Sequence, residues 1–271
     1  MKALSLLLML LTAPLALAQD GLARLREIQE KCYTPVQKGM ADLVVDVVIP
    51  QLTKQLNEQA IFGHLNEVGF RVYWTAKPER IAVEVTGLPE GFREIKEDLK
   101  ARALMKLEEV VPLPLEKKFE GYVFRLDADK SAVRAVDESG LRVIPEFVVV
   151  PDGGLLPTKL IAKRTIGNQV TETVWAKAPW SEPRAHPTRS VTTIQEGPQT
   201  ATIETTRTWQ VIAGIGVPSQ VRSVVSQRLQ TGSDAEKNLS RQSEELVLFK
   251  NYKINQGEAM KWFLAAGSGT P

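Results

Sequence analysis

The chain has 271 residues, of which 43% are hydrophobic, and its 34 basic side chains nearly balance its 32 acidic ones. This length and composition allow one sizeable hydrophobic core, or two small ones. The charges are interspersed, so the sequence offers neither a basic stripe for nucleic acid nor a polybasic patch for a membrane surface. A single cysteine excludes an intrachain disulfide, and we expect Cys32 to be a small buried hydrophobe on a helix face.

The first residues predict a secretory signal peptide. Lys2 gives a positive start, residues 3–17 are almost wholly apolar, and Ala16 and Ala18 fit the small-residue rule for cleavage. We therefore expect cleavage after Ala18, export to the periplasm, and a single domain over residues 19–271. A membrane-spanning anchor is disfavoured because the apolar run is short and contains Pro14.

The chain then opens with a predicted helix near residues 20–33, where Asp20 is the cap and apolar residues from Leu22 to Cys32 recur at helical spacing. Residues 41–50 are rich in β-branched side chains and predict a strand. The next segment, residues 51–68, suits either a short helix or a broad loop.

A hairpin follows over residues 70–89. Apolar and polar side chains alternate in both of its arms, which is typical of strands with one buried face. Pro78 in the segment Lys77–Arg80 predicts a type I turn between them. The apolar faces of the two arms consist of Phe70, Val72 and Trp74, and of Ile81, Val83 and Val85.

A second amphipathic helix is expected near residues 90–111, ended by Pro112 and Pro114. Turn signals then recur at the spacing of a meandering antiparallel sheet. Three prolines predict an exposed loop over residues 177–189, residues 232–236 predict another loop, and residues 257–265 a last helical turn. The expected strands cover residues 122–126, 132–136, 143–150, 160–165, 170–176, 191–194, 200–212, 220–229 and 244–252.

Groups that carry chemistry are sparse. His64 and His186 have no neighbouring serine, cysteine or second histidine at a meaningful spacing, so we expect solvent-facing or structural roles for both. The chain contains no G-x-S-x-G, H-E-x-x-H or C-x-x-C motif. We therefore expect no enzyme activity, no metal and no cofactor.

Two acidic patterns also have ordinary explanations. The segment Asp127–Ser131 resembles a calcium-binding loop, but Ala132 stands where such a loop needs glycine, so a solvated hairpin turn is expected. The adjacent pairs Glu108–Glu109 and Glu244–Glu245 place their side chains in different directions. We expect all four carboxylates to be surface charges.

Apolar surface remains as the candidate for function. Aromatic residues lie in or beside the predicted strands, namely Trp74, Tyr122, Phe124, Trp175 and Trp209. They form either an ordinary core beneath the helices or the lining of a cavity for an acyl chain. The sequence pattern leaves both interpretations open.

Several of these segments resemble a known family. They are similar to the outer-membrane lipoprotein-sorting family of periplasmic lipoprotein carriers. The first is the signal peptide, helix and strand followed by Trp74–Val85. The others are the run Val211–Arg222, with its Gly-apolar-Pro entry into a strand, and the closing strand Leu246–Asn255. The resemblance implies an unclosed β-barrel whose helices cover the concave face, bind acyl chains beneath them, and open and close as a lid. Its relatives also include envelope-stress regulators.

We therefore predict an α+β fold, a curved antiparallel β-sheet (an unclosed half-barrel) with helices covering the concave face. The predicted function is a periplasmic, non-enzymatic carrier or sensor of a lipid or lipoprotein acyl chain. The alternative is a structural or regulatory envelope protein that binds a protein partner through the sheet edge or concave face. The predicted ligand-binding face consists of Val72, Trp74, Ile81, Val83, Val85, Tyr122, Phe124 and Leu126.

Overall fold

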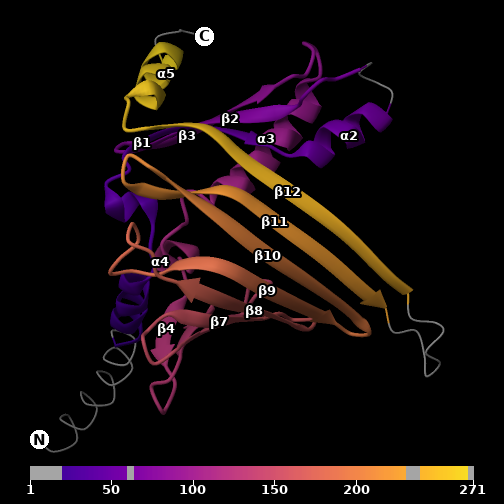
Figure 1. Cartoon of the computed structure of the whole chain (residues 1–271). Helices are drawn as coiled ribbons and strands as arrows, with labels where there is room; N and C mark the ends of the chain where they lie inside the picture. The colour runs from indigo at the N-terminus through magenta and orange to yellow at the C-terminus, as the bar shows by residue number, and fades with distance from the viewer. Residues whose placement is uncertain (1–19, 60–63, 230–238, 268–271) are drawn as a thin grey trace, which may run out of the picture.

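One antiparallel sheet of twelve strands organises the fold, in the order β3-β2-β1-β12-β11-β10-β9-β8-β7-β6-β5-β4 (Figure 1). A computed structural model describes residues 20–59, 64–229 and 239–267. The predicted signal peptide and the loop at 232–236 lie outside these residues. The strands are β1 Asp42–Val48, β2 Gly69–Ala76, β3 Glu79–Thr86, β4 Val123–Leu126, β5 Val133–Val136, β6 Glu146–Pro151, β7 Pro157–Lys163, β8 Asn168–Ala176, β9 His186–Glu196, β10 Gln199–Ile212, β11 Ile215–Leu229 and β12 Leu239–Ile254.

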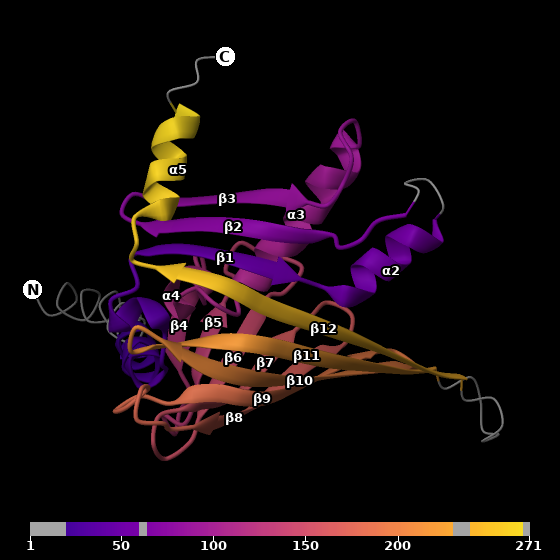
Figure 2. The ribbon, with the colours of Figure 1, turned by 45° about the horizontal axis from the view of Figure 1, so that its top comes forward.

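The strand order has one long-range junction. Strands β4 to β12 pair consecutively along the chain, and β12 then returns to pair with β1, placing Val47 opposite Phe249. Strands β3 and β4 end the sheet without pairing with each other, so the curved sheet stays unclosed (Figure 2). The predicted α+β class and unclosed curved sheet are confirmed.

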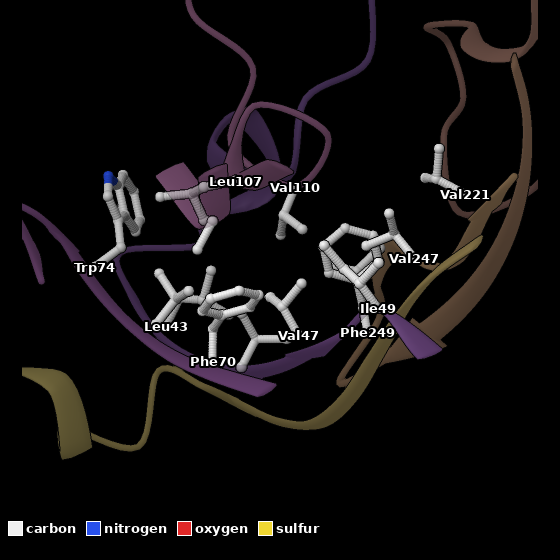
Figure 3. Close-up of a cluster of buried hydrophobic side chains, with 14 of the residues drawn as sticks. Leu43, Val47, Ile49, Phe70, Trp74, Leu107, Val110, Val221, Val247 and Phe249 are labelled. Carbon is white, nitrogen blue, oxygen red and sulfur yellow. The ribbon is translucent and has the colours of Figure 1, made fainter. Parts of the chain in front are cut away.

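Helices cover the concave face in two places. The helices are residues 20–31, the short 3₁₀ helix η1 Pro35–Lys38, α2 Pro50–Glu58, α3 Arg93–Leu107, α4 Leu115–Lys118 and α5 Glu258–Gly267. Helix α3 packs Leu99, Ala103 and Leu107 against the inward side chains of β1, β2, β11 and β12. In Figure 3, Leu107 and the following Val110 lie above Leu43, Phe70 and other side chains that rise from the curved sheet.

The helix over residues 20–31 makes the second contact. Its Leu25 and Ile28 are buried against Val133 of β5 and Val149 of β6. A β-carbon at Gly21 would lie only 2.7 Å from the backbone nitrogen of Arg125, so this helix approaches β4 more closely than any other residue would permit. Both helices predicted for the concave face are therefore found there.

Helix α5 packs on the opposite, convex face. Trp262 stacks on Tyr73 with 4.6 Å between ring centroids, and Ala259 is buried beside Val44. The carboxylate of Asp42 accepts a hydrogen bond from the backbone nitrogen of Met260 at 3.0 Å. The alternating faces of β1 and β2 are thus both covered, one by α3 and the other by α5.

The structure corrects one local prediction, confirms another in part and settles one that was open. The hairpin turn is a two-residue loop, Lys77–Pro78, with a cis peptide bond instead of a type I turn. The exposed loop predicted at 177–189 is confirmed in part: residues 177–185 form a loop in which Pro179 and Pro183 are exposed, but Ser181 and Ala185 are buried and β9 begins at His186. Prolines tolerate turns that are partly packed, so their number did not show which residues would be buried. The ambiguous segment at 51–68 contains α2.

Candidate functional site

A cavity of about 310 Å³ lies between the helices and the concave face. We use the word lid for the helix over residues 20–31, its turn to Pro35, and the segment from α3 through α4. The lid contributes Gln29, Cys32, Tyr33, Thr34, Pro35, Glu108, Glu109, Pro112, Leu113, Leu115 and Lys118 to the lining. The sheet contributes Val149, Pro157, Leu160, Thr171, Thr173, Trp175, Pro187, Ser190, Arg207 and Trp209.

Two other hollows, of about 710 and 470 Å³, are larger but more open. The first lies beside α2, with Lys54, Glu58 and Glu67 among its lining residues. The second lies at the far ends of the long strands, near Arg228 and Arg241. Of these three hollows in the described part of the chain, the cavity beneath the lid has the largest share of apolar lining residues, which is typical of small-ligand sites.

The floor of the cavity changes in polarity from strand to strand. Arg207 on β10 and Ser190 on β9 lie at one side, and Thr171 and Thr173 on β8 follow. Leu160 on β7 and Val149 on β6 complete the floor at its other side. An apolar row crosses the same strands beside these residues and consists of Pro157, Trp175, Pro187 and Trp209. Three strand spacings separate β10 from β7, a span of about 14 Å. A ligand with one polar end and one apolar end matches this lining.

An ion pair marks the polar side of the cavity. The guanidinium of Arg207 donates two hydrogen bonds to the carboxylate of Glu109, at 2.6 and 3.1 Å, and a third to the hydroxyl of Ser190 at 3.2 Å. The side chains of Arg207 and Glu109 are only 14% and 25% exposed. Because Glu109 follows α3 and Arg207 belongs to β10, this bidentate pair joins the lid to the sheet.

Four aromatic side chains, Tyr33, Trp180, His186 and Trp209, form a cluster at one end of the cavity. We call them the aromatic cluster. The ring of Trp180 covers Gly216 so closely that a β-carbon there would lie 2.0 Å from a ring atom. The indole nitrogen of Trp209 donates to the carbonyl of Pro187 at 3.0 Å. The cluster thereby fixes both the turn after the first helix and one wall of the cavity.

Burial determines the protonation of the groups beside this cluster. It raises the pKa of the Cys32 thiol to about 12, and it raises the pKa of Tyr33 to about 12 despite an opposing hydrogen bond that the Gly216 N–H donates to the phenol oxygen. Burial also lowers the pKa of His186. Its Nδ1 lies 3.3 Å from the hydroxyl of Ser181, which also contacts the backbone of Ala178. The prediction of a buried Cys32 is confirmed, and His186 lies in a packed aromatic environment.

The lid has further polar connections. The backbone nitrogen of Leu115 donates to the side-chain oxygen of Gln29 at 2.8 Å, which joins α4 to the first helix. On β12, the carboxylate of Glu245 accepts hydrogen bonds from Arg102 and Lys106 of α3. Burial alone would raise the pKa of Glu245, but these two cations lower it below its usual value.

The expectation that all four paired glutamates are surface charges is therefore wrong for two of them. Glu109 faces Arg207 in the cavity, and Glu245 faces α3. Glu244, in contrast, pairs with Arg222 and is about half exposed. Because neighbours on a strand point to opposite faces, one member of the Glu244–Glu245 pair turns inward. The alternation could be read from the sequence, but the sequence did not show which basic residues would pair with the inward-facing carboxylates.

The eight residues of the predicted ligand-binding face divide into two groups. Val72 and Trp74 are buried beneath α3, Val83 and Val85 pack against the same cluster, and Ile81 is 47% exposed. The second group, Tyr122, Phe124 and Leu126, packs against the cluster around the first helix. The strands that form the cavity floor lie between the two groups, and none of the eight is among the described residues that line the cavity.

Sequence reasoning had singled out two cavity residues, Trp175 and Trp209, as aromatic residues near strands. It missed Arg207 and Glu109 because nothing local distinguishes an inward arginine in a threonine-rich strand from a solvated one.

The hairpin expected at Asp127–Ser131 is confirmed by the bonds of Ser131 to the carboxylate of Asp129. Among residues 20–59, 64–229 and 239–267, no cluster of three or more histidine, cysteine or acidic side chains is arranged to hold a metal ion.

Comparisons with known proteins add no assignment: no protein-family model, no curated protein and no solved structure matches this chain. Within the described part of the chain, none of the helices has the length and apolar character needed to span a membrane.

Proposed function

We propose that the protein is an exported, non-enzymatic carrier or sensor that holds one acyl chain in the cavity beneath the lid. The observation that carries this proposal is the cavity lining, to which the sheet contributes the apolar side chains of Val149, Leu160, Trp175 and Trp209. The resemblance of the sequence to periplasmic lipoprotein carriers supports the same function. The ligand-binding face is thereby moved from the eight predicted residues to the space between their two groups.

The driving force for binding is the removal of apolar surface from water, about 25 cal/mol per Å² of buried area. Ordering of the ligand and the surrounding side chains offsets part of this gain. A volume of about 310 Å³ is near the lower end of the range for small-ligand pockets, which extends from about 300 to 1,000 Å³. We therefore propose that a cavity of this volume holds one acyl chain and not the several acyl chains of a whole lipoprotein anchor.

Export is part of the proposal and is tested separately. Sequencing of the protein recovered from a periplasmic fraction should give Gln19 as the first residue, since cleavage is expected after Ala18. A protein that is retained in the cytoplasm with Met1 intact would contradict the export step.

The cavity tryptophans provide a direct binding assay. A fatty acid that carries bromine on its chain should quench the fluorescence of Trp175 and Trp209 in a saturable way, because both indoles line the cavity. The variant Thr173→Phe fills part of the cavity and should abolish this quenching. The matched control is Val174→Phe on the same strand, where the side chain is 54% exposed and absent from the lining. Equal quenching in both variants would place the ligand elsewhere and contradict the proposal.

A specific observation also favours the alternative, a protein partner bound at the sheet edge. Strand β3 is eight residues long and ends the sheet, so its outer backbone groups pair with no strand among the described residues. A folded protein that binds no acyl chain and is crosslinked to a partner through β3 would support this alternative.

A further inference from the structure

We infer that the acyl compound held in the cavity carries an oxyanion, a carboxylate or a phosphate, that takes the place of Glu109 on Arg207. This inference rests on the proposed function and specifies its ligand. The starting observation is the position of the ion pair: Arg207 and Glu109 both line the same cavity as Leu160 and Trp175. The charged groups of this pair are thus accessible to a ligand whose acyl chain occupies the apolar part of the cavity.

The hydrogen bonds of Arg207 favour such an exchange. Its guanidinium has five N–H donors in a planar fork, and three of them contact Glu109 and Ser190. A carboxylate or phosphate reproduces the bidentate contact that Glu109 now makes. A neutral head, such as an alcohol, cannot replace the carboxylate of Glu109 in this way. If it left Glu109 in place, it would gain no contact with Arg207. If it displaced Glu109, the guanidinium charge would lose its partner in an apolar environment, which is unfavourable.

The charge balance also favours exchange over simple addition. Glu109 already neutralises Arg207, so a second anion beside this largely buried pair would add an uncompensated negative charge there. The two other charged residues of the lining, Glu108 and Lys118, are exposed. When the ligand's oxyanion replaces the glutamate, Arg207 keeps one partner. The Glu109 carboxylate, already 25% exposed, then turns toward water.

The geometry sets the orientation of the ligand. With its head at Arg207 on β10, the chain runs across β9 and β8 toward Leu160 and Val149. The hydroxyls of Ser190 and Thr173 lie near the head, because Ser190 bonds to Arg207 and Thr173 is the partner of Ser190 on β8, and Leu160 and Val149 lie two and three strands farther from the head than Ser190. Glu109 lies two residues beyond the end of α3, so its release also removes the ion pair that joins this part of the lid to β10. The buried Val110 and the contacts of Glu245 with Arg102 and Lys106 still hold α3 on the sheet. Binding of the head is therefore coupled to the loss of one contact between lid and sheet.

The test compares dodecanoate, dodecyl phosphate and dodecanol, which share one chain and differ in the head. Their affinities are measured at mildly alkaline pH by displacement of the brominated fatty acid. The wild-type protein should bind at least one of the two anions about threefold to tenfold more tightly than the alcohol, and the tighter anion identifies the source of the head. In Glu109→Gln the competing carboxylate is gone, so this preference should increase to about tenfold or more.

The double variant Arg207→Gln/Glu109→Gln is uncharged at the pair and should bind the anions and the alcohol equally. It also avoids leaving a buried glutamate without a partner, as Arg207→Gln alone would. Chemical unfolding curves establish that each variant is folded. If the wild-type protein binds the alcohol as tightly as both anions, or if Glu109→Gln leaves the preference unchanged, the inference is overturned while the carrier function stands. Failure of all three compounds to bind would instead overturn the proposed function.

Discussion

Tyr33 and Gly216, 183 residues apart, are joined by two reciprocal hydrogen bonds. The tyrosine hydroxyl donates to the glycine carbonyl at 2.9 Å and accepts from the glycine N–H at 2.8 Å. Both residues are buried, and Trp180 covers the glycine from one side. One hydroxyl therefore satisfies both backbone groups of Gly216 and attaches the turn after the first helix to β11.

Removal of this hydroxyl should be more harmful than the loss of one ordinary hydrogen bond. Tyr33→Phe leaves a buried N–H and a buried carbonyl without their partner, and we expect a loss of about 2–3 kcal/mol in the free energy of unfolding. Tyr122→Phe is the control, since its hydroxyl makes one bond, to the partly buried carbonyl of Ile144. Its expected loss is about 1 kcal/mol. Urea unfolding that shows equal losses would contradict the special role of Tyr33.

Gly21 should be required for seating the first helix on the sheet. Alanine normally stabilises a helix by about 1 kcal/mol relative to glycine. Here its β-carbon would meet the backbone of Phe124 and Arg125 at 2.7 Å, and backbone atoms cannot rotate away. We therefore expect Gly21→Ala to lower the stability by about 1–2 kcal/mol in spite of its helix propensity.

Gly153 provides the control for that substitution, because a β-carbon there meets nothing within 4 Å. Thermal unfolding should show Gly153→Ala within about 0.5 kcal/mol of the wild-type protein. A Gly21→Ala variant that melts at or above the wild-type temperature would show that the helix is not held as closely as the structure indicates.

Glu245 should contribute more to stability than its neighbour Glu244. Glu245→Gln leaves Arg102 and Lys106 without their shared carboxylate, and the expected loss is about 1–3 kcal/mol. Glu244→Gln breaks an exposed pair with Arg222, and its expected loss is below about 1 kcal/mol. Because the cations lower the pKa of Glu245, the stabilisation is present above the ordinary glutamate pKa and disappears as the pH falls through the lowered value. Unfolding curves at neutral and acidic pH measure both effects, and equal losses for the two variants would contradict the prediction.

Alkaline pH should destabilise the fold through Cys32 and Tyr33. Both groups have a folded-state pKa of about 12, above the ordinary values of 9.0 and 10.0. Between these values the unfolded chain loses a proton that the folded chain retains, so stability is complete below the ordinary pKa and falls as the pH rises.

Cys32 should dominate this slope between about pH 9 and 10, because its unfolded-state thiol ionises first. The variant Cys32→Ala should have a shallower decline in unfolding free energy over that range. The same burial predicts that a thiol reagent labels Cys32 only after unfolding. Rapid labelling of the folded protein would contradict the raised pKa.

The sequence predicted most of the elements but not the site. The alternation of residues in β2 and β3 is a local periodicity that can be read from the sequence. In α3 the pattern is weaker, because Leu104 and Met105 are exposed beside the buried Leu99, Ala103 and Leu107. The cavity depends on pairs such as Glu109 with Arg207, which are 98 residues apart. The two residues come together because β10 passes beneath the end of α3. Similarly, Trp180 lies in a proline-rich segment that was predicted to be exposed, but its ring packs closely against Gly216 of β11.

The most direct test of the central claim is mass spectrometry of the compounds extracted from the folded protein after its purification from native envelopes without detergent. The account predicts about one acyl-bearing molecule per wild-type chain, its retention in Val174→Phe, and its loss in Thr173→Phe. A wild-type protein that is folded and carries no acyl compound, or a Thr173→Phe variant that retains the full amount, would contradict the assignment of the cavity as the acyl-chain site.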